Sequence, residues 1–220
     1  MPEPDVPQEQ KRDRRSRMIA WIIFLAGVAL VALYYVMTVP GSSPKVVTDA
    51  PGVGDGPQIA LAITGEAQGE VVIELFDDLA PKHVDRILTL AREGAYDGVV
   101  FHRVIDGFMA QTGDVQHGRA GGDLGLAGTG ASSYPDLPAE FSNEPFVAGT
   151  VGMARSSDPN SANAQFFIMF DKAPHLDGDY TAVGRVIEGM DVVAQIKRGT
   201  GGNGRVVGAP DVLERMRIVE

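Results

Sequence analysis

Cysteine is absent from the 220-residue chain, and this absence excludes several kinds of chemistry at once. The chain can form no disulfide, bind no metal through thiolates and offer no cysteine nucleophile. None of its four histidines stands at the spacing of a zinc motif, and no Gly-x-Ser-x-Gly segment marks a serine nucleophile. We therefore expect no metal, no other cofactor and no covalent intermediate.

Positive charge is also in short supply. The chain has 19 Lys and Arg against 29 Asp and Glu, which gives a net charge of −10. The first 17 residues hold five basic and four acidic side chains, or +1, so the remainder carries −11. An acidic surface repels the phosphate backbone, and nucleic acid is not expected as a partner.

Charged residues are missing altogether from residues 18–39. As a helix this run would be about 33 Å long, enough to cross a hydrocarbon core of about 30 Å. Trp21 lies near one end and Tyr34 and Tyr35 near the other, where interfacial aromatic residues are common. The alternative is a cleaved signal peptide, whose apolar core is shorter, about 7 to 15 residues, and ends in a small-residue cleavage site. No Ala-x-Ala follows Val39, and the sequence favours an uncleaved transmembrane anchor.

The residues around this anchor predict its orientation and the domain organisation. Five Lys and Arg precede it within 1–17, whereas only Lys45 follows it closely. The positive-inside rule then keeps the N-terminus in the cytoplasm and exports the rest, which predicts a single-pass protein of the inner membrane facing the periplasm. Residues 40–57 contain four prolines and four glycines, the composition of a linker. The predicted parts are a basic tail (1–17), an anchor (18–39), a linker (40–57) and a folded domain (58–220).

The folded domain reads as mainly β. Strands are expected at 58–64, 70–76, 150–153, 165–170, 181–186 and 212–219, where β-branched and apolar residues recur between turn signals. One helix is expected with Asp77 and Asp78 at its start, Pro81 in its first turn and Gly94 after its end, and His83 on its exposed surface. A second is expected at 190–198. Many short strands with two helices predict a closed antiparallel barrel, capped at its ends.

The segment 101–114 predicts a hairpin with a functional face. Asp106-Gly107 is a turn dipeptide, and strand alternation puts Arg103, Met109 and Gln111 on one side. That side carries a permanent cation, a soft apolar group and a carboxamide. By spacing alone this remains ordinary, because structural arginines beside apolar residues are common.

Three blocks of sequence, taken together, resemble the cyclophilins, a family of peptidyl-prolyl cis-trans isomerases. The first is Phe-His-Arg-Val-Ile-x-Gly-Phe-Met-x-Gln-x-Gly-Asp at 101–114. The second is Gly-Thr-Val-Gly-Met-Ala-Arg at 149–155 followed by Asn-Ala-Gln-Phe-Phe-Ile at 163–168. The third is His-Leu-Asp-Gly at 175–178 before Ala-Val-Gly-Arg-Val at 182–186. The resemblance covers roughly 58–220, and we expect a barrel of eight strands.

The resemblance implies a site in which Arg103 is catalytic. The substrate-binding residues that it implies are Phe108, Met109, Gln111, Ala154, Gln165, Phe167, His175 and Leu176. The partners would be proline-containing peptides and unfolded exported proteins. Turning an X-Pro bond breaks no covalent bond and moves no proton, which agrees with the absence of a nucleophilic or acid-base set.

The chain also departs from the best-known pattern of that family. Arg155 stands where that pattern has an asparagine, Tyr180 where it has a histidine, and His175 where it has a tryptophan. These departures leave Arg103 in place but bear on peptide preference. The rival interpretation is a non-catalytic peptide-binding or chaperone module tethered at the membrane.

Overall fold

Nine short strands, joined by glycine-rich turns, build one antiparallel sheet in the computed structural model, which describes residues 56–219. The strands are β1 Gln58–Thr64, β2 Gly69–Leu75, β3 Val99–Val100, β4 Arg103–Ile105, β5 Met109–Thr112, β6 Thr150–Met153, β7 Phe166–Met169, β8 Ala182–Glu188 and β9 Val212–Val219. The helices are α2 Pro81–Arg92 and α3 Met190–Gln195, with 3₁₀ turns η1 Leu124–Leu126 and η2 Pro174–Leu176. The fold is thus mainly β with two helices, as predicted.

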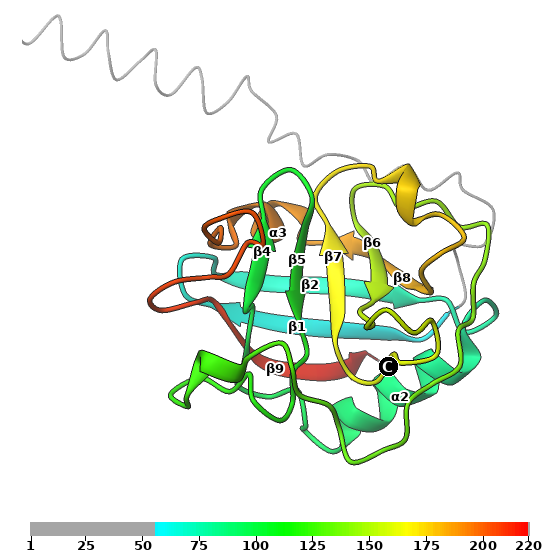
Figure 1. Ribbon diagram of the computed structural model, residues 1–220, viewed down its shortest axis with the longest axis horizontal. Coiled ribbons are helices and arrows are strands. Elements are labelled where there is room, and N and C mark those ends of the chain that lie inside the picture. The colour runs from blue at the N-terminus through cyan, green and yellow to red at the C-terminus, as the bar shows by residue number, and fades with distance from the viewer. Residues whose placement is uncertain (1–55, 220) are drawn as a thin grey trace, which may run out of the picture. The chain divides into compact units, whose positions relative to one another are not determined.

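The sheet curls so that its two edge strands, which are consecutive in the sequence, come close together. Its strand order is β3-β9-β1-β2-β8-β6-β7-β5-β4. Only Phe101 and His102 separate the edge strands β3 and β4, so their ends lie at most about 11 Å apart. Figure 1 shows β4, β5, β7 and β6 passing across the front of β1 and β2.

The expected number of eight strands is wrong, because the run 99–105 breaks at Phe101 and His102 into β3 and β4. Each of the two pieces pairs with a different neighbour. β3 joins β9, and β4 joins β5. The hydrogen-bonded order therefore has two ends and forms a curled sheet, with no ladder joining β3 to β4 among the described residues.

The core fills the inside of this curl and extends beneath the helices. Its largest fully buried side chains include Leu61, Ile73, Phe101 and Phe166. Helix α2 packs on β9 and α3 on β2, so the two helices cover different parts of the sheet. Helix α2 begins at Pro81, and Asp77 and Asp78 lie before it rather than in its first turn.

His83 is buried, which corrects the expectation of a surface position on the helix. Its side chain is 0% exposed, and its Nδ1 lies 2.6 Å from Oε2 of Glu140. Glu140 also accepts hydrogen bonds from the backbone N–H groups of Lys82 and His83. Ala80 provides no side-chain cap, so a distant carboxylate satisfies the first N–H groups of α2. Burial lowers the pKa of His83 below its ordinary 6.5, although the hydrogen bond that the Glu140 carboxylate accepts opposes this shift.

Buried aspartates fix the long loops in the same way. Asp114, 0% exposed, accepts from the backbone N–H groups of Gln116, His117, Gly128 and Gly130. Burial tends to raise the pKa of Asp114, but these four donors outweigh it and leave the pKa below its usual value. Asp211 accepts from the N–H groups of Ala67 and Lys197. The glycine-rich stretch after β5 is therefore ordered against the sheet.

The predicted N-terminal parts lie outside this description. Within residues 56–219 no helix has both the length and the apolar character needed to cross a bilayer. The tail at 1–17, the anchor at 18–39 and nearly all of the linker at 40–57 fall outside the described residues.

Candidate functional site

The hairpin of β4 and β5 carries the side chains on which the site is built. In its register Arg103 lies opposite Gln111, and Ile105 lies opposite Met109. Residues paired across antiparallel strands share a face, so Arg103, Met109 and Gln111 project from one side, as the alternation predicts. Gly107 in the connecting turn has φ +66°, a left-handed conformation that favours glycine.

Two oxygen acceptors hold the Arg103 guanidinium, and its Nη1 also lies 3.8 Å from Sδ of Met109. Its Nε donates to the backbone carbonyl of Asn203 at 2.9 Å, and its Nη1 donates to Oε1 of Gln111 at 3.1 Å. The group is half-buried, and burial lowers the pKa of Arg103 below its usual value. Among residues 56–219 no carboxylate lies within ion-pair distance of it. The positive charge is therefore oriented but not neutralised.

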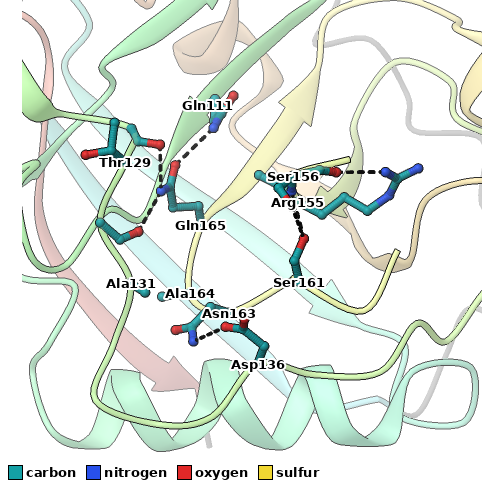
Figure 2. A pocket seen from close by; sticks show the side chains of 13 residues that line it. Gln111, Thr129, Ala131, Asp136, Arg155, Ser156, Ser161, Asn163, Ala164 and Gln165 are labelled. Carbon is teal, nitrogen blue, oxygen red and sulfur yellow. Dashed lines mark hydrogen bonds between the residues drawn. The ribbon is translucent and has the colours of Figure 1, made fainter. Parts of the chain in front are cut away.

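A chain of carboxamides fixes Gln111 in turn. Its Nε2 donates to Oε1 of Gln165 at 3.0 Å, and the Nε2 of Gln165 donates to the carbonyls of Gly128 and Gly130 at 3.1 and 2.8 Å. Figure 2 shows this chain running from the hairpin through Gln165 to the neighbouring loop. Because every link is satisfied, the oxygen of Gln111 is directed at Arg103.

A cavity of about 140 Å³ opens beside the guanidinium, with apolar side chains along one part of its wall and polar ones along the rest. Phe167 (5% exposed), Met109 (1%) and Leu176 (6%) belong to one buried apolar cluster, against which Phe108 packs. The predicted site residues that line the cavity are Arg103, Phe108, Met109, Gln111, Ala154, Phe167 and Leu176. The structure thus brings a fixed cation and an apolar hollow together, although the role of each residue toward a substrate stays a prediction.

Two predicted residues lie just outside this cavity. Gln165 lines an adjoining cavity of about 390 Å³, which shares Gln111, Ala154 and Arg155 with the first (Figure 2). His175 is exposed and does not line the smaller cavity. Its ring stacks on Phe108 with the centroids 5.7 Å apart. His175 therefore borders the site through Phe108.

Arg155 and Tyr180 line the cavity but were not predicted as site residues. The guanidinium of Arg155 lies 4.3 Å from the centroid of the Tyr180 ring and donates to the carbonyl of Asp179 at 2.9 Å. Tyr180 meets Phe167 edge to face, with the centroids 5.9 Å apart. A signal was available, because both positions depart from the cyclophilin pattern.

Phe146 and Gly152 support the cavity through Phe167, and neither was predicted as a site residue. The rings of Phe146 and Phe167 stack with their centroids 5.9 Å apart. Gly152 on β6 pairs with Phe167 on β7. A Cβ at Gly152 would lie 2.5 Å from Cζ of Phe167 and 2.6 Å from Cε1 of Phe146. The two rings occupy the space that a side chain would need.

This arrangement suits the binding of a ligand and the polarisation of one of its polar atoms. The site offers a cationic donor, two carboxamides and an apolar hollow. Among residues 56–219 no group of three or more His, Asp or Glu is placed to hold a metal ion. A planar apolar ring could occupy the hollow while the guanidinium donates to a polar atom beside it.

Comparisons with known proteins all identify peptidyl-prolyl cis-trans isomerases as similar to this chain. Residues 59–219 match the family model described as cyclophilin type peptidyl-prolyl cis-trans isomerase/CLD. A probable peptidyl-prolyl cis-trans isomerase of Brucella suis biovar 1 is 61% identical over 152 residues, covering 68% of this chain and 78% of that protein. A peptidyl-prolyl cis-trans isomerase of Synechococcus elongatus is 38% identical, covering 63% and 89%.

Solved structures show a similar fold. Cyclophilin AquaCyp293 from Hirschia baltica matches with a TM-score of 0.59 and 29% identity, covering 73% of both chains. A Cryptosporidium parvum cyclophilin type peptidyl-prolyl cis-trans isomerase, crystallised in the presence of the dipeptide Ala-Pro, matches with a TM-score of 0.62 and 24% identity. That comparison covers 74% of this chain and 99% of the other.

Proposed function

Because this chain belongs to the cyclophilin-type peptidyl-prolyl cis-trans isomerase family, we propose that it accelerates X-Pro bond rotation in exported proteins, with Arg103 as the catalytic residue. The observation that carries the proposal is the fixed guanidinium beside a cavity whose wall includes Phe108, Phe167 and Leu176.

The barrier to be lowered is amide resonance, which opposes rotation by about 18–20 kcal/mol. In the twisted transition state the prolyl nitrogen becomes pyramidal and gains a lone pair. A donor aimed at that lone pair binds more strongly as the bond twists, so it stabilises the transition state over the ground state. Arg103 fits this role, because a guanidinium keeps its charge and Gln111 and Asn203 hold its plane.

One donor does not supply the whole effect. Shortening tens of seconds to about a millisecond requires a factor of about 10⁴, or about 5.5 kcal/mol. A single preorganised donor typically contributes about 3–4 kcal/mol. The cavity formed by Phe108, Met109, Phe167 and Leu176 supplies the remainder in this proposal, by holding the proline ring and removing water from the amide.

The test is a proline-exchange assay on the full-length chain in detergent micelles, with Arg103→Ala as the variant. The wild type should accelerate exchange, and Arg103→Ala should lower kcat/KM by about 10²–10³, as for loss of one transition-state donor. The fold should persist because the guanidinium is half-buried at a cavity rim. Unchanged turnover in the folded variant would exclude the mechanism.

The rival is a non-catalytic, membrane-tethered peptide-binding module that uses the same cavity. It predicts that the wild type binds proline-containing peptides without accelerating exchange. Titration of such a peptide alongside the exchange assay separates the two, because only the enzyme gives exchange that depends on Arg103.

We also propose that residues 18–39 anchor the protein in the inner membrane with residues 1–17 in the cytoplasm. The uncharged run and the five basic residues before it support this topology. Full-length protein should fractionate with membranes, and protease should reach Asp55 onward only from the periplasmic side. A soluble product that lacks about 40 residues would indicate a signal peptide instead.

A further inference from the structure

The loop between α3 and β9 covers the sheet edge beside Arg103. Its segment Asn203–Val206 lies along β4, where Arg103 and Arg205 form an antiparallel bridge. The N–H of Val104 donates to the carbonyl of Gly204 at 2.7 Å, and the N–H of Val206 donates to the carbonyl of His102 at 3.1 Å. The segment thereby pairs with the strand that otherwise ends the sheet.

The same segment presents the carbonyl that accepts from Nε of Arg103 at 2.9 Å. Gln111 provides the other oxygen acceptor, at Nη1. A planar guanidinium held by one oxygen can turn about that contact, whereas two acceptors on different nitrogens fix its plane. The Gln111 contact comes from β5 and the Asn203 contact from the loop, so the orientation of Arg103 depends on both.

Two features fix the segment in place. Gly204 is buried at φ +69°, and a Cβ there would lie 2.3 Å from Cγ1 of Ile105 and 2.8 Å from the carbonyl oxygen of Val104. On the outer side, Nη2 of Arg205 donates to the carbonyls of Leu124 and Gly125 at 2.8 and 3.1 Å. Only glycine at position 204 lets the backbone approach β4 this closely.

We propose that Asn203–Val206 is a positioning element for catalysis, whose Asn203 carbonyl holds Arg103 at the angle that the twisted prolyl nitrogen requires. The inference rests on the proposed isomerase function and adds to it a backbone group, remote in sequence, that orients the catalytic residue. Because Arg103 acts in the transition state, displacing the segment lowers kcat and leaves KM little changed.

The decisive pair of variants is Gly204→Ala and Gly202→Ala in the full-length chain. Gly204→Ala forces the segment away from β4 and should lower kcat by about 10- to 100-fold, the effect of misplacing a catalytic group by about 1 Å. Gly202 lies at the exposed tip of the loop, has no left-handed φ, and would place its Cβ more than 4 Å from other atoms. Gly202→Ala should therefore match the wild type.

A background that lacks Nε shows whether the effect passes through Arg103. In Arg103→Lys, adding Gly204→Ala should change kcat no further, since lysine has no Nε to be oriented. An equal loss in both backgrounds would mean that the segment acts only on stability. Retained activity in Arg103→Ala would instead refute the proposed mechanism itself. A different result would refute the positioning role alone. In that case Arg103→Ala loses its activity, whereas Gly204→Ala and Arg205→Ala remain as active as Gly202→Ala.

Two measurements remain decisive if Gly204→Ala fails to fold. Arg205→Ala removes an exposed side chain and the two bonds to η1, and should lower kcat in the same direction by a few-fold. In ¹⁵N-arginine spectra of the wild type, the Nε–H of Arg103, assigned with Arg103→Lys, should exchange with water more slowly than those of Arg92 and Arg215. Those two exposed side chains make no hydrogen bond within residues 56–219, and equal exchange rates would overturn the proposal.

Discussion

Gly152→Ala tests whether the position of the Phe167 ring controls catalysis. The new methyl would lie 2.5 Å from Phe167 and 2.6 Å from Phe146, whereas carbon atoms pack best at about 3.5–4.0 Å. The methyl would contact both of the stacked rings, so Phe167 must move by about 1 Å to relieve the overlap. The open space into which it can move is the 140 Å³ cavity.

Both stability and turnover should respond to this displacement. Overpacking of a core typically costs about 1–3 kcal/mol. At about 2–4 °C of Tm for each kcal/mol, Tm should fall by about 2–12 °C. Loss of the proline-ring site should lower kcat/KM by about 10- to 100-fold, since misplacement by about 1 Å can have that effect.

The assay is proline exchange well below Tm, with two comparison variants. Ile63→Val, in the larger core cluster, should cost about 0.5–1.5 kcal/mol and leave kcat/KM unchanged. Gly152→Ala combined with Phe146→Leu gives the methyl room and should recover part of the turnover. Wild-type kcat/KM in a folded Gly152→Ala protein would refute the reasoning, as would failure of Phe146→Leu to restore any activity.

Two further predictions concern histidines. The pKa of His83 is lowered in the folded state. Below pH 6.5, the ordinary pKa of histidine, His83 therefore binds a proton more readily in the unfolded chain than in the folded one. The free energy of unfolding should consequently fall as the pH is lowered from about 7 to about 5. His83→Gln should flatten that slope in urea titrations, and an unaltered slope would contradict the assignment. The resemblance to the cyclophilins implies that a tryptophan, common at the position of His175, would donate its indole N–H to bound cyclosporin. This chain should therefore bind the drug weakly, and His175→Trp should gain about 1–3 kcal/mol in calorimetry. No gain would show that His175, stacked on Phe108, lies out of reach of the drug.

The sequence predicts the parts of this site that depend on local pattern. Alternation places Arg103, Met109 and Gln111 on one face because strand geometry has a period of two, and the register of β4 and β5 confirms it. Three of the expected strands, at 58–64, 150–153 and 212–219, match the structure residue for residue.

Features that depend on contacts distant in sequence could not be predicted. The carbonyl of Asn203 meets Arg103 across 100 positions, and Glu140 meets His83 across 57. A backbone carbonyl is the same in every residue, so sequence pattern cannot identify it as an acceptor for a guanidinium. His83 looked like a surface residue because its partner lies in an irregular segment without a periodic signal.

Carboxylates that accept backbone N–H groups take the place of covalent cross-links in this fold. Asp114 ties together residues 116 to 130, Asp211 joins the segments around 67 and 197, and Glu140 holds the start of α2. None of these ties involves sulfur, so reductants and thiol-exchange enzymes cannot loosen them, and their assembly requires no oxidant. The loops beside the site can therefore form at any glutathione potential. Protonation of Asp114 or Glu140, whose pKa values lie below their usual range in the fold, would weaken the ties that those two carboxylates make.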